Sequence, residues 1–155
     1  VLYHMNLHKA VSVCCNKYGL FSFNLKRTSC KELTKNRTQY NHKPGIYIFT
    51  RNNEVFYIGS TSDILRRVGK ENCQAQIAAS ECSFRFMLYL LDKICNEIKE
   101  ENSIKAKERL VKNIVRNFMN KLTIYIILSD VLRERRIRTD IEECLINYLK
   151  PILQQ

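Results

Sequence analysis

The chain has 155 residues, which is enough for one domain with an appendage, and its hydrophobic fraction of 45% leaves material for a real core. No run of about 18 apolar residues occurs, and this excludes a membrane-spanning helix. The formal net charge of +11 favours a polyanionic partner, either nucleic acid or an anionic membrane surface, although solubility or targeting would also explain it.

The seven cysteines do not suggest a disulfide framework. Their number is odd, no CxxC pair occurs, and only Cys14 and Cys15 are neighbours. This pattern is typical of free thiols in a reducing compartment, so we predict an intracellular protein without disulfides.

The N-terminal part of the chain is basic. Residues 1–31 contain no Asp or Glu, and they combine scattered Ser with Lys9, Lys17, Lys26, Arg27 and Lys31. Such a composition is typical of an organellar transit segment, but an N-terminal extension or the edge of a fragment fits equally. Residues 32–43 are polar and are typical of a linker. We therefore predict a basic extension or targeting segment over 1–43, with a mitochondrial or nuclear location open, and a folded domain over 44–155.

The stretch from Pro44 to Lys70 predicts a β-hairpin followed by a helix. The segments GIYIFT and EVFYIG are rich in β-branched and aromatic residues, and the RNNE between them supplies two asparagines that tolerate turn conformations. Asp63, with hydroxyl residues before it, suits a helix start, so we expect a short helix over 63–70.

The remainder predicts helices around one further strand. Apolar residues recur at helical spacing over 81–119, so a segment of about 71–120 is expected to be a helical insertion. KLTIYIIL at 121–128 is apolar enough for a central strand. The last helix is expected to begin at Thr139, which forms a capping-box pattern with Glu142, and to end before Pro151. The order of elements indicates a small α+β sheet.

Four features at fixed spacing carry a resemblance to a known family. They are GIY at 45–47, YIG at 57–59, Arg67 eight residues after Gly59, and the segment E-x-x-L-I-x-x-L-K-P at 142–151. Over about residues 44–154 the chain resembles the GIY-YIG nuclease superfamily, which includes homing endonucleases and repair nucleases. The resemblance implies an α+β fold with a small three-stranded mixed sheet flanked by helices.

The resemblance also implies roles for four residues. Tyr47 would take the proton of the attacking water and Tyr57 would position the reactants, both from one face of the hairpin. Arg67 would lower the pKa of the base and bind the scissile phosphate. Glu142 would hold one Mg²⁺ or Mn²⁺. Taken singly, the tyrosines could instead be core aromatics and Glu142 only a capping residue.

Further residues are expected to bind the substrate. Gln154 stands where members of the family often carry Asn, so it either substitutes for that residue or marks a weakened site. The basic tract RERRIR is a candidate contact with DNA phosphates. The full set of expected substrate-binding residues is Gly45, Gly59, Ser60, Arg66, Gln154, Arg133, Arg135 and Arg136, with Arg138 in the same tract.

Two functions stay open at this point. The first is a metal-dependent DNA endonuclease, of the homing or the repair type. The second is a catalytically weakened or inactive nucleic-acid-binding protein on the same fold. A protein partner could supply targeting in either case, and the sequence indicates neither the DNA substrate nor the oligomeric state.

Overall fold

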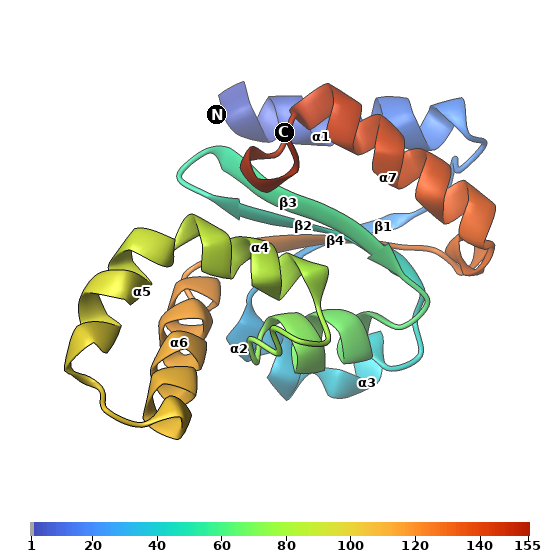
Figure 1. Ribbon diagram of the computed structural model, residues 1–155. Helices are drawn as coiled ribbons and strands as arrows, with labels where there is room; N and C mark the ends of the chain where they lie inside the picture. Colours follow the sequence, from blue (N-terminus) through green and yellow to red (C-terminus); the bar gives the residue numbers. More distant parts are fainter. Residues whose placement is uncertain (1) are drawn as a thin grey trace.

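A four-stranded antiparallel sheet runs through the centre of the molecule (Figure 1). This computed structural model describes residues 2–155, with side chains from residue 6 onward, so Val1 of the expected extension lies outside the described residues. The strand order is β1-β4-β2-β3. The strands are β1 (Asn24–Thr28), β2 (Gly45–Arg51), β3 (Glu54–Thr61) and β4 (Thr123–Leu128).

The sheet differs from the expected one in both size and direction. The α+β class is confirmed, and β4 is a central strand as predicted, but the three-stranded mixed sheet is wrong because β1 pairs with β4 and every pairing is antiparallel. The fourth strand has the sequence NLKRT, which is polar and basic. Charged residues such as Lys26 and Arg27 are common in edge strands. In the sequence alone they indicated only a basic extension.

The predicted hairpin is confirmed as β2 and β3. Its turn residues Asn52 and Asn53 both have positive φ, at 50° and 65°. Two-residue hairpin turns of this type require left-handed backbone at both central positions, and asparagine tolerates it better than most residues. The turn chemistry therefore fixes the register of the two strands that carry the tyrosines.

A β-bulge in the hairpin places two consecutive aromatic residues on one face. Phe49 pairs with Tyr57, but Thr50 pairs with Val55, so Phe56 is an extra residue on β3. Phe56 and Tyr57 consequently belong to the same hydrophobic cluster, whereas Val55 belongs to the cluster on the opposite face. Without the bulge, strict alternation would separate Phe56 from Tyr57.

Two helices cover one face of the sheet (Figure 1). They are α1 (Leu2–Lys17) and α7 (Arg135–Leu149), and a short 3₁₀ turn, η3 (Asp130–Arg133), leads from β4 into α7. Leu7 and Val11 of α1 pack with Leu145 of α7. The same cluster contains Ile46 and Ile127, whose side chains lie on this face of the sheet. The segment up to residue 43 thus contributes a helix to this layer, in addition to strand β1.

The other face carries the remaining helices and an aromatic cluster. Phe56 and Phe49 contact Phe86, both with ring centroids 5.9 Å apart, and Phe118 lies 5.7 Å from Phe56. These contacts fix the predicted helical segment against the sheet. The elements on this side are α2 (Cys30–Lys35), α3 (Arg37–Tyr40), the π-helix η1 (Leu65–Asn72), α4 (Glu81–Tyr89), α5 (Leu91–Glu97), the 3₁₀ helix η2 (Ile98–Glu100) and α6 (Ile104–Met119).

Residues 32–43 are therefore not a linker. They contain most of α2 and all of α3, and Leu33 and Tyr40 are buried in the core. Ser29 caps α2 by accepting a hydrogen bond from the Glu32 N–H at 3.3 Å. Single buried apolar residues in a polar stretch gave no periodic signal that sequence reasoning could use.

The prediction of free thiols is wrong for four of the seven cysteines. Cys14 of α1 is bonded to Cys144 of α7, and Cys30 of α2 is bonded to Cys73, which directly follows η1. The partners are 130 and 43 residues apart in sequence, so spacing could not reveal them. The cysteines no longer support a reducing compartment.

The end of the chain is fastened to the edge of β3. Gln154, in the 3₁₀ turn η4 (Ile152–Gln154), accepts a hydrogen bond from the Ile58 N–H and donates one to the Ile58 carbonyl, both at 2.8 Å. Its amide thus imitates one rung of a neighbouring strand and satisfies backbone groups that an edge strand leaves unpaired.

We predict that Gln154→Ala lowers the free energy of unfolding by about 1–3 kcal/mol, because both backbone groups of Ile58 lose their partner. Gln155→Ala is the matched control, since exposed Gln155 only donates to the Lys150 carbonyl and should change stability by less than about 0.5 kcal/mol. Urea unfolding and hydrogen exchange at the Ile58 amide measure the difference. Equal effects of the two substitutions would contradict the prediction.

Candidate active site

Tyr47 and Tyr57 lie side by side on the face of the hairpin that α4 and α6 cover. Their ring centroids are 6.3 Å apart and the ring planes differ by 21°. Tyr47 pairs across the strands with Gly59, and a Cβ at that position would collide with the ring and the hydroxyl of Tyr47. Glycine at 59 therefore makes the space in which the Tyr47 ring lies.

Both tyrosines are strongly buried, with exposed fractions of 3% for Tyr47 and 8% for Tyr57. Burial raises the pKa of each phenol well above its ordinary value, and the Cys82 thiol of α4 acts in the same direction. For Tyr47, the Asn72 side chain and the Arg67 guanidinium oppose this rise in pKa. The resting state of the site thus has two neutral phenols.

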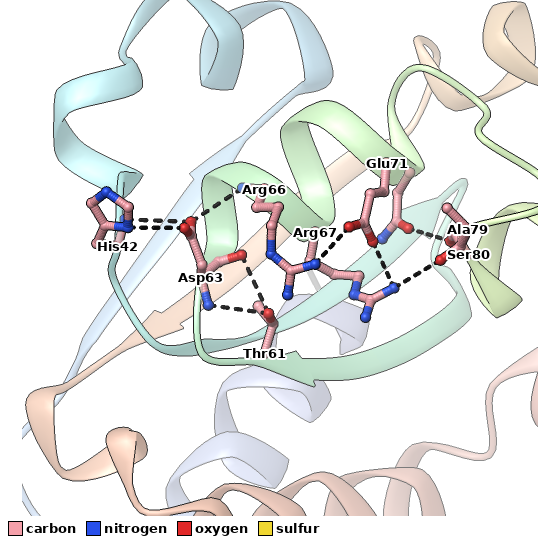
Figure 2. Close-up of polar contacts among 9 residues, drawn as sticks. His42, Thr61, Asp63, Arg66, Arg67, Glu71, Ala79 and Ser80 are labelled. Atoms are coloured by element: carbon pink, nitrogen blue, oxygen red, sulfur yellow. Dashed lines mark hydrogen bonds and ion pairs between the residues drawn. The ribbon is translucent and has the colours of Figure 1, made fainter.

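The helix after β3 begins at a polar cap (Figure 2). Asp63 Oδ1 accepts the Arg66 N–H at 3.1 Å and the His42 N–H at 3.3 Å, while Thr61 Oγ1 accepts the Asp63 N–H at 3.1 Å. The predicted helix is present, but it begins at Leu65 rather than at Asp63. The helix is a π-helix that extends to Asn72, beyond the predicted end at Lys70.

Glu71 holds the two arginines of this helix (Figure 2). Its carboxylate lies 2.7 Å from Arg66 Nη1 and 2.6 Å from Arg67 Nη1, and Arg67 also donates to the Ala79 carbonyl at 3.2 Å. The Arg67 side chain keeps an exposed fraction of 31%. Arg67 is thereby fixed in direction beside Tyr47, with part of its guanidinium open to solvent.

Glu142 belongs to α7, which covers the opposite face of the sheet, and its side chain reaches Ser60 near the C-terminal end of β3. Its Oε2 accepts a hydrogen bond from the Ser60 hydroxyl, and its negative charge acts on Tyr57. Burial raises the pKa of the half-buried Glu142 carboxyl, and Glu81 and Glu143 add to the rise, while Ser60 and Arg138 lower it. β3 is an edge strand, so a side chain from α7 can meet this strand end.

The capping box expected at Thr139 and Glu142 is wrong. Helix α7 begins at Arg135, so both residues lie inside it, and Glu142 accepts from Ser60 rather than from a helix end. The basic tract after β4 starts this helix instead of forming a connection. Helix capping therefore does not explain the presence of a carboxylate at position 142.

The structure brings some expected residues together and leaves others apart. Tyr47 stacks on Tyr57, and the charges of Arg67 and Glu142 are near enough to act on Tyr47 and Tyr57 respectively. Ser60 belongs to the site through Glu142, and Arg66 through Glu71.

The other expected binding residues lie outside this set. Gln154 is engaged by the backbone of Ile58, and Gly45 packs where a Cβ would lie 2.7 Å from the Ile127 carbonyl oxygen. Arg138 donates to the Leu132 and Arg133 carbonyls, and so it stabilises the start of α7. Arg133, Arg135 and Arg136 are exposed on the surface, with Arg133 3.8 Å from Asp130.

Sequence reasoning missed four residues of the site. Glu71, Asn72, Ser80 and Cys82 lie in the segment that was expected only to support the fold. Ser80 caps α4 by accepting the Ser83 N–H at 3.1 Å, and a serine just before a helical pattern is the only signal that could have found it. The other three carry no motif.

The donor set at Glu142 fits a hard cation. Among the described residues, no group of three or more His, Cys, Asp or Glu side chains is placed to hold a metal ion. A lone carboxylate that is half-buried and repelled by Glu81 would be relieved by a divalent cation, and oxygen ligands completed by water suit Mg²⁺ or Mn²⁺ better than zinc. The residues present therefore fit the group that the resemblance implies.

No helix within the described part of the chain has the length and apolar character needed to cross a membrane.

Comparison with known proteins identifies the family. The family model of the GIY-YIG catalytic domain matches residues 43–123, from the residue before Pro44 to the first residue of β4. No curated protein and no solved structure matched the chain. The matched region ends before Glu142, so the place of this carboxylate in the site rests on its hydrogen bond with Ser60 and on the effect of its charge on Tyr57. More than half of the chain is matched, and the two tripeptides lie on paired strands of an α+β sheet, so the chain has a nuclease fold and belongs to the GIY-YIG family.

Proposed function

We propose that the protein is a metal-dependent DNA endonuclease that hydrolyses phosphodiester bonds. The observation that carries the proposal is the stacked pair Tyr47 and Tyr57, with the charges of Arg67 from η1 and Glu142 from α7 acting on the two phenols. A phosphodiester hydrolase needs a proton acceptor, a cation for the phosphate and a ligand for a metal ion within a single site. This set supplies all three.

Each residue has a distinct task in the proposal. Tyr47 Oη takes the proton of the attacking water, while Tyr57 orients that water or the phosphate beside it. The open part of the Arg67 guanidinium binds a phosphate oxygen, in competition with Glu71. Glu142, oriented by Ser60, is the side chain that would hold Mg²⁺ or Mn²⁺. Once bound, the cation supplies positive charge against the scissile phosphate.

The exposed arginines at the start of α7 supply a surface for the DNA backbone. Arg135 and Arg136 are exposed, and they lie on the helix that also carries Glu142. Contacts of this kind hold the phosphates without reading the base sequence. The net charge of +11 supports a polyanionic partner in general, and the position of these arginines connects that charge to the site.

A second function is favoured by two specific observations. Tyr47 is only 3% exposed with a raised pKa, and Arg67 is already paired with Glu71 at 2.6 Å. A site in this condition also fits a protein that binds nucleic acid on the same fold and cleaves it slowly or not at all. Cleavage assays separate the two functions directly.

The first test is plasmid cleavage by the wild type and Glu142→Gln, with Mg²⁺, with Mn²⁺ and with EDTA. We expect cleavage to require the metal and to fall by at least about a hundredfold in the variant, because the ligand for the cation is lost. Glu143→Gln is the matched control, since Glu143 is the exposed neighbour on the same helix. Binding without cleavage of supercoiled, branched or single-stranded DNA would favour the second function.

The pH dependence tests the assignment of the base. Because the pKa of Tyr47 is raised, the deprotonated fraction grows with pH throughout the accessible range. Single-turnover rates at saturating metal should therefore rise about tenfold per pH unit from pH 7 to 9, and Tyr47→Phe should abolish this rise. A plateau below about pH 8 in the wild type would contradict a tyrosine base, since an ordinary phenol titrates near 10.

Salt dependence tests the DNA surface independently of cleavage. Arg135→Ala and Arg136→Ala should each reduce the slope of log binding constant against log salt by about one, because each removes one phosphate contact. Fluorescence anisotropy with a labelled duplex measures the slope, and Lys105→Ala on exposed, distant α6 is the control. Unchanged slopes in both arginine variants would place the DNA elsewhere.

A further inference from the structure

A buried polar pair, Asn72 and Ser80, lies close to Tyr47. Asn72, the last residue of η1, has an exposed fraction of 0%, and Ser80, just before α4, has 3%. The Ser80 hydroxyl donates to Asn72 Oδ1 at 2.5 Å and accepts the Ser83 N–H at 3.1 Å. The Ser80 hydroxyl thus acts as both donor and acceptor within the protein. Its position is fixed by the start of α4.

The π-helix brings Asn72 onto the same side as Arg67. In an α-helix, residues five apart point about 140° away from one another, since each residue turns the chain by about 100°. In a π-helix the backbone bonds join residues i and i+5, so Arg67 and Asn72 lie on successive turns of one face. The disulfide from Cys73 to Cys30 fastens the end of this helix to α2 and holds Asn72 in place.

The amide nitrogen of Asn72 is left without a well-formed hydrogen bond. Asn72 Nδ2 is buried and makes no hydrogen bond of good geometry within the described part of the chain. It is nevertheless close enough to the Tyr47 hydroxyl to lower the pKa of that tyrosine. The other groups that act on Tyr47 are Tyr57 from β3 and Cys82 from α4, which oppose ionisation, and Arg67 from η1, which favours it.

A buried N–H donor without a partner requires an explanation, because folded proteins satisfy nearly all such groups. Donors that serve a reaction are often long or poorly aligned in the resting protein, and they tighten as charge develops on the acceptor. With Oδ1 held by Ser80, the Nδ2 group is the donor available to an atom that must be negative before it can take a proton from water. This atom is Tyr47 Oη.

We propose that Asn72 is a positioning residue of the active site: Ser80 holds its side chain, and its amide donates to the Tyr47 oxygen and stabilises the phenolate that forms when Tyr47 releases its proton to solvent, the form that can then take a proton from water. The role of Tyr47 as the base rests on the proposed function, whereas the contact between Asn72 and Tyr47 does not. The Ser80–Asn72 pair therefore connects the start of α4 to the proton acceptor on β2.

The contact can be measured without any cleavage reaction. Replacing Tyr47 by 3,5-difluorotyrosine lowers the phenol pKa and gives a single ¹⁹F signal, so the residue can be titrated in the otherwise unchanged protein. We expect the pKa of this residue to rise by about one unit in Asn72→Ala, which loses the donor. Asn72→Asp keeps the size of the side chain and the acceptor for Ser80, but it offers a carboxylate in place of the amide. It should raise the pKa further.

Kinetics test the consequence for cleavage. Asn72→Ala should lower kcat about tenfold at fixed pH with KM little changed, which corresponds to one pKa unit at the base. Difluorotyrosine at position 47 should restore most of the lost rate in this variant, because it lowers the pKa of the base by other means. A residue that only supports the fold would not be rescued in this way.

Ser80→Ala should produce a smaller change in the same direction, since the amide becomes free to rotate. Because Ser80 also caps α4, the matched control is Ser103→Ala, which removes the equivalent cap from the Ala106 N–H on α6. The control should lose similar stability and leave the titration of residue 47 unchanged.

The outcomes separate this inference from the proposed function. An unchanged pKa of residue 47 in both Asn72 variants, or a lower pKa in Asn72→Asp than in the wild type, would overturn the inference whether or not the protein cleaves DNA. The expected order of pKa, wild type below Asn72→Ala below Asn72→Asp, in a protein without nuclease activity would support the contact and reject the proposed function.

Discussion

The site depends on the packing of the Tyr47 ring over Gly59. Because no side chain exists at position 59, the ring can lie across the neighbouring strand and stack on Tyr57, 6.3 Å away. Any Cβ at 59 would occupy the volume of the ring, so the glycine of the second tripeptide and the tyrosine of the first are one structural unit. The spacing of the two motifs follows from the register of the hairpin, which pairs these two residues.

The two faces of the sheet contribute different parts of the chemistry. The face beneath α4 and α6 holds the tyrosines in an aromatic core, while α7 on the other face brings Glu142 to the end of β3 through Ser60. Both sides are tied down by links distant in sequence: Cys14–Cys144 between α1 and α7, and Cys30–Cys73 between α2 and η1. The N-terminal segment thus supports both halves of the site, in addition to any targeting function that its composition suggested.

Local chemistry allowed the hairpin, the central strand and the helical segment to be predicted. The turn at Asn52 and Asn53 and the apolar run of β4 are properties of adjacent residues, and sequence patterns report such properties well. The wrong predictions concern features that depend on residues distant in sequence. Strand β1 is polar in sequence and becomes a strand only by pairing with β4, and the disulfides join residues that no spacing relates. The residues Thr139 and Glu142 have the spacing of a capping box, and so a helix start was predicted there. Helix α7 begins four residues earlier, at Arg135.

The same distinction applies within the site. Arg67 could be found from its offset to Gly59, but Asn72 could not, because an α-helical pattern places it about 140° away from Arg67. Only the π-helical turn aligns the two residues, and it is not visible in the sequence.

Burial of Tyr47 makes its ionisation unfavourable. The free energy of this cost can be compared with the free energy that nearby donors contribute. Each unit by which the pKa exceeds the working pH costs about 1.4 kcal/mol to form the phenolate. A hydrogen bond to a charged group contributes about 1.5–3 kcal/mol, or one to two units, so neither Arg67 nor Asn72 alone offsets a fully buried phenol. Acting together, they would offset more of the cost of ionisation than either does alone. On this view the burial of Tyr47 keeps most of the resting phenol neutral, and the fixed donors around it stabilise the minor phenolate population that would accept a proton from water.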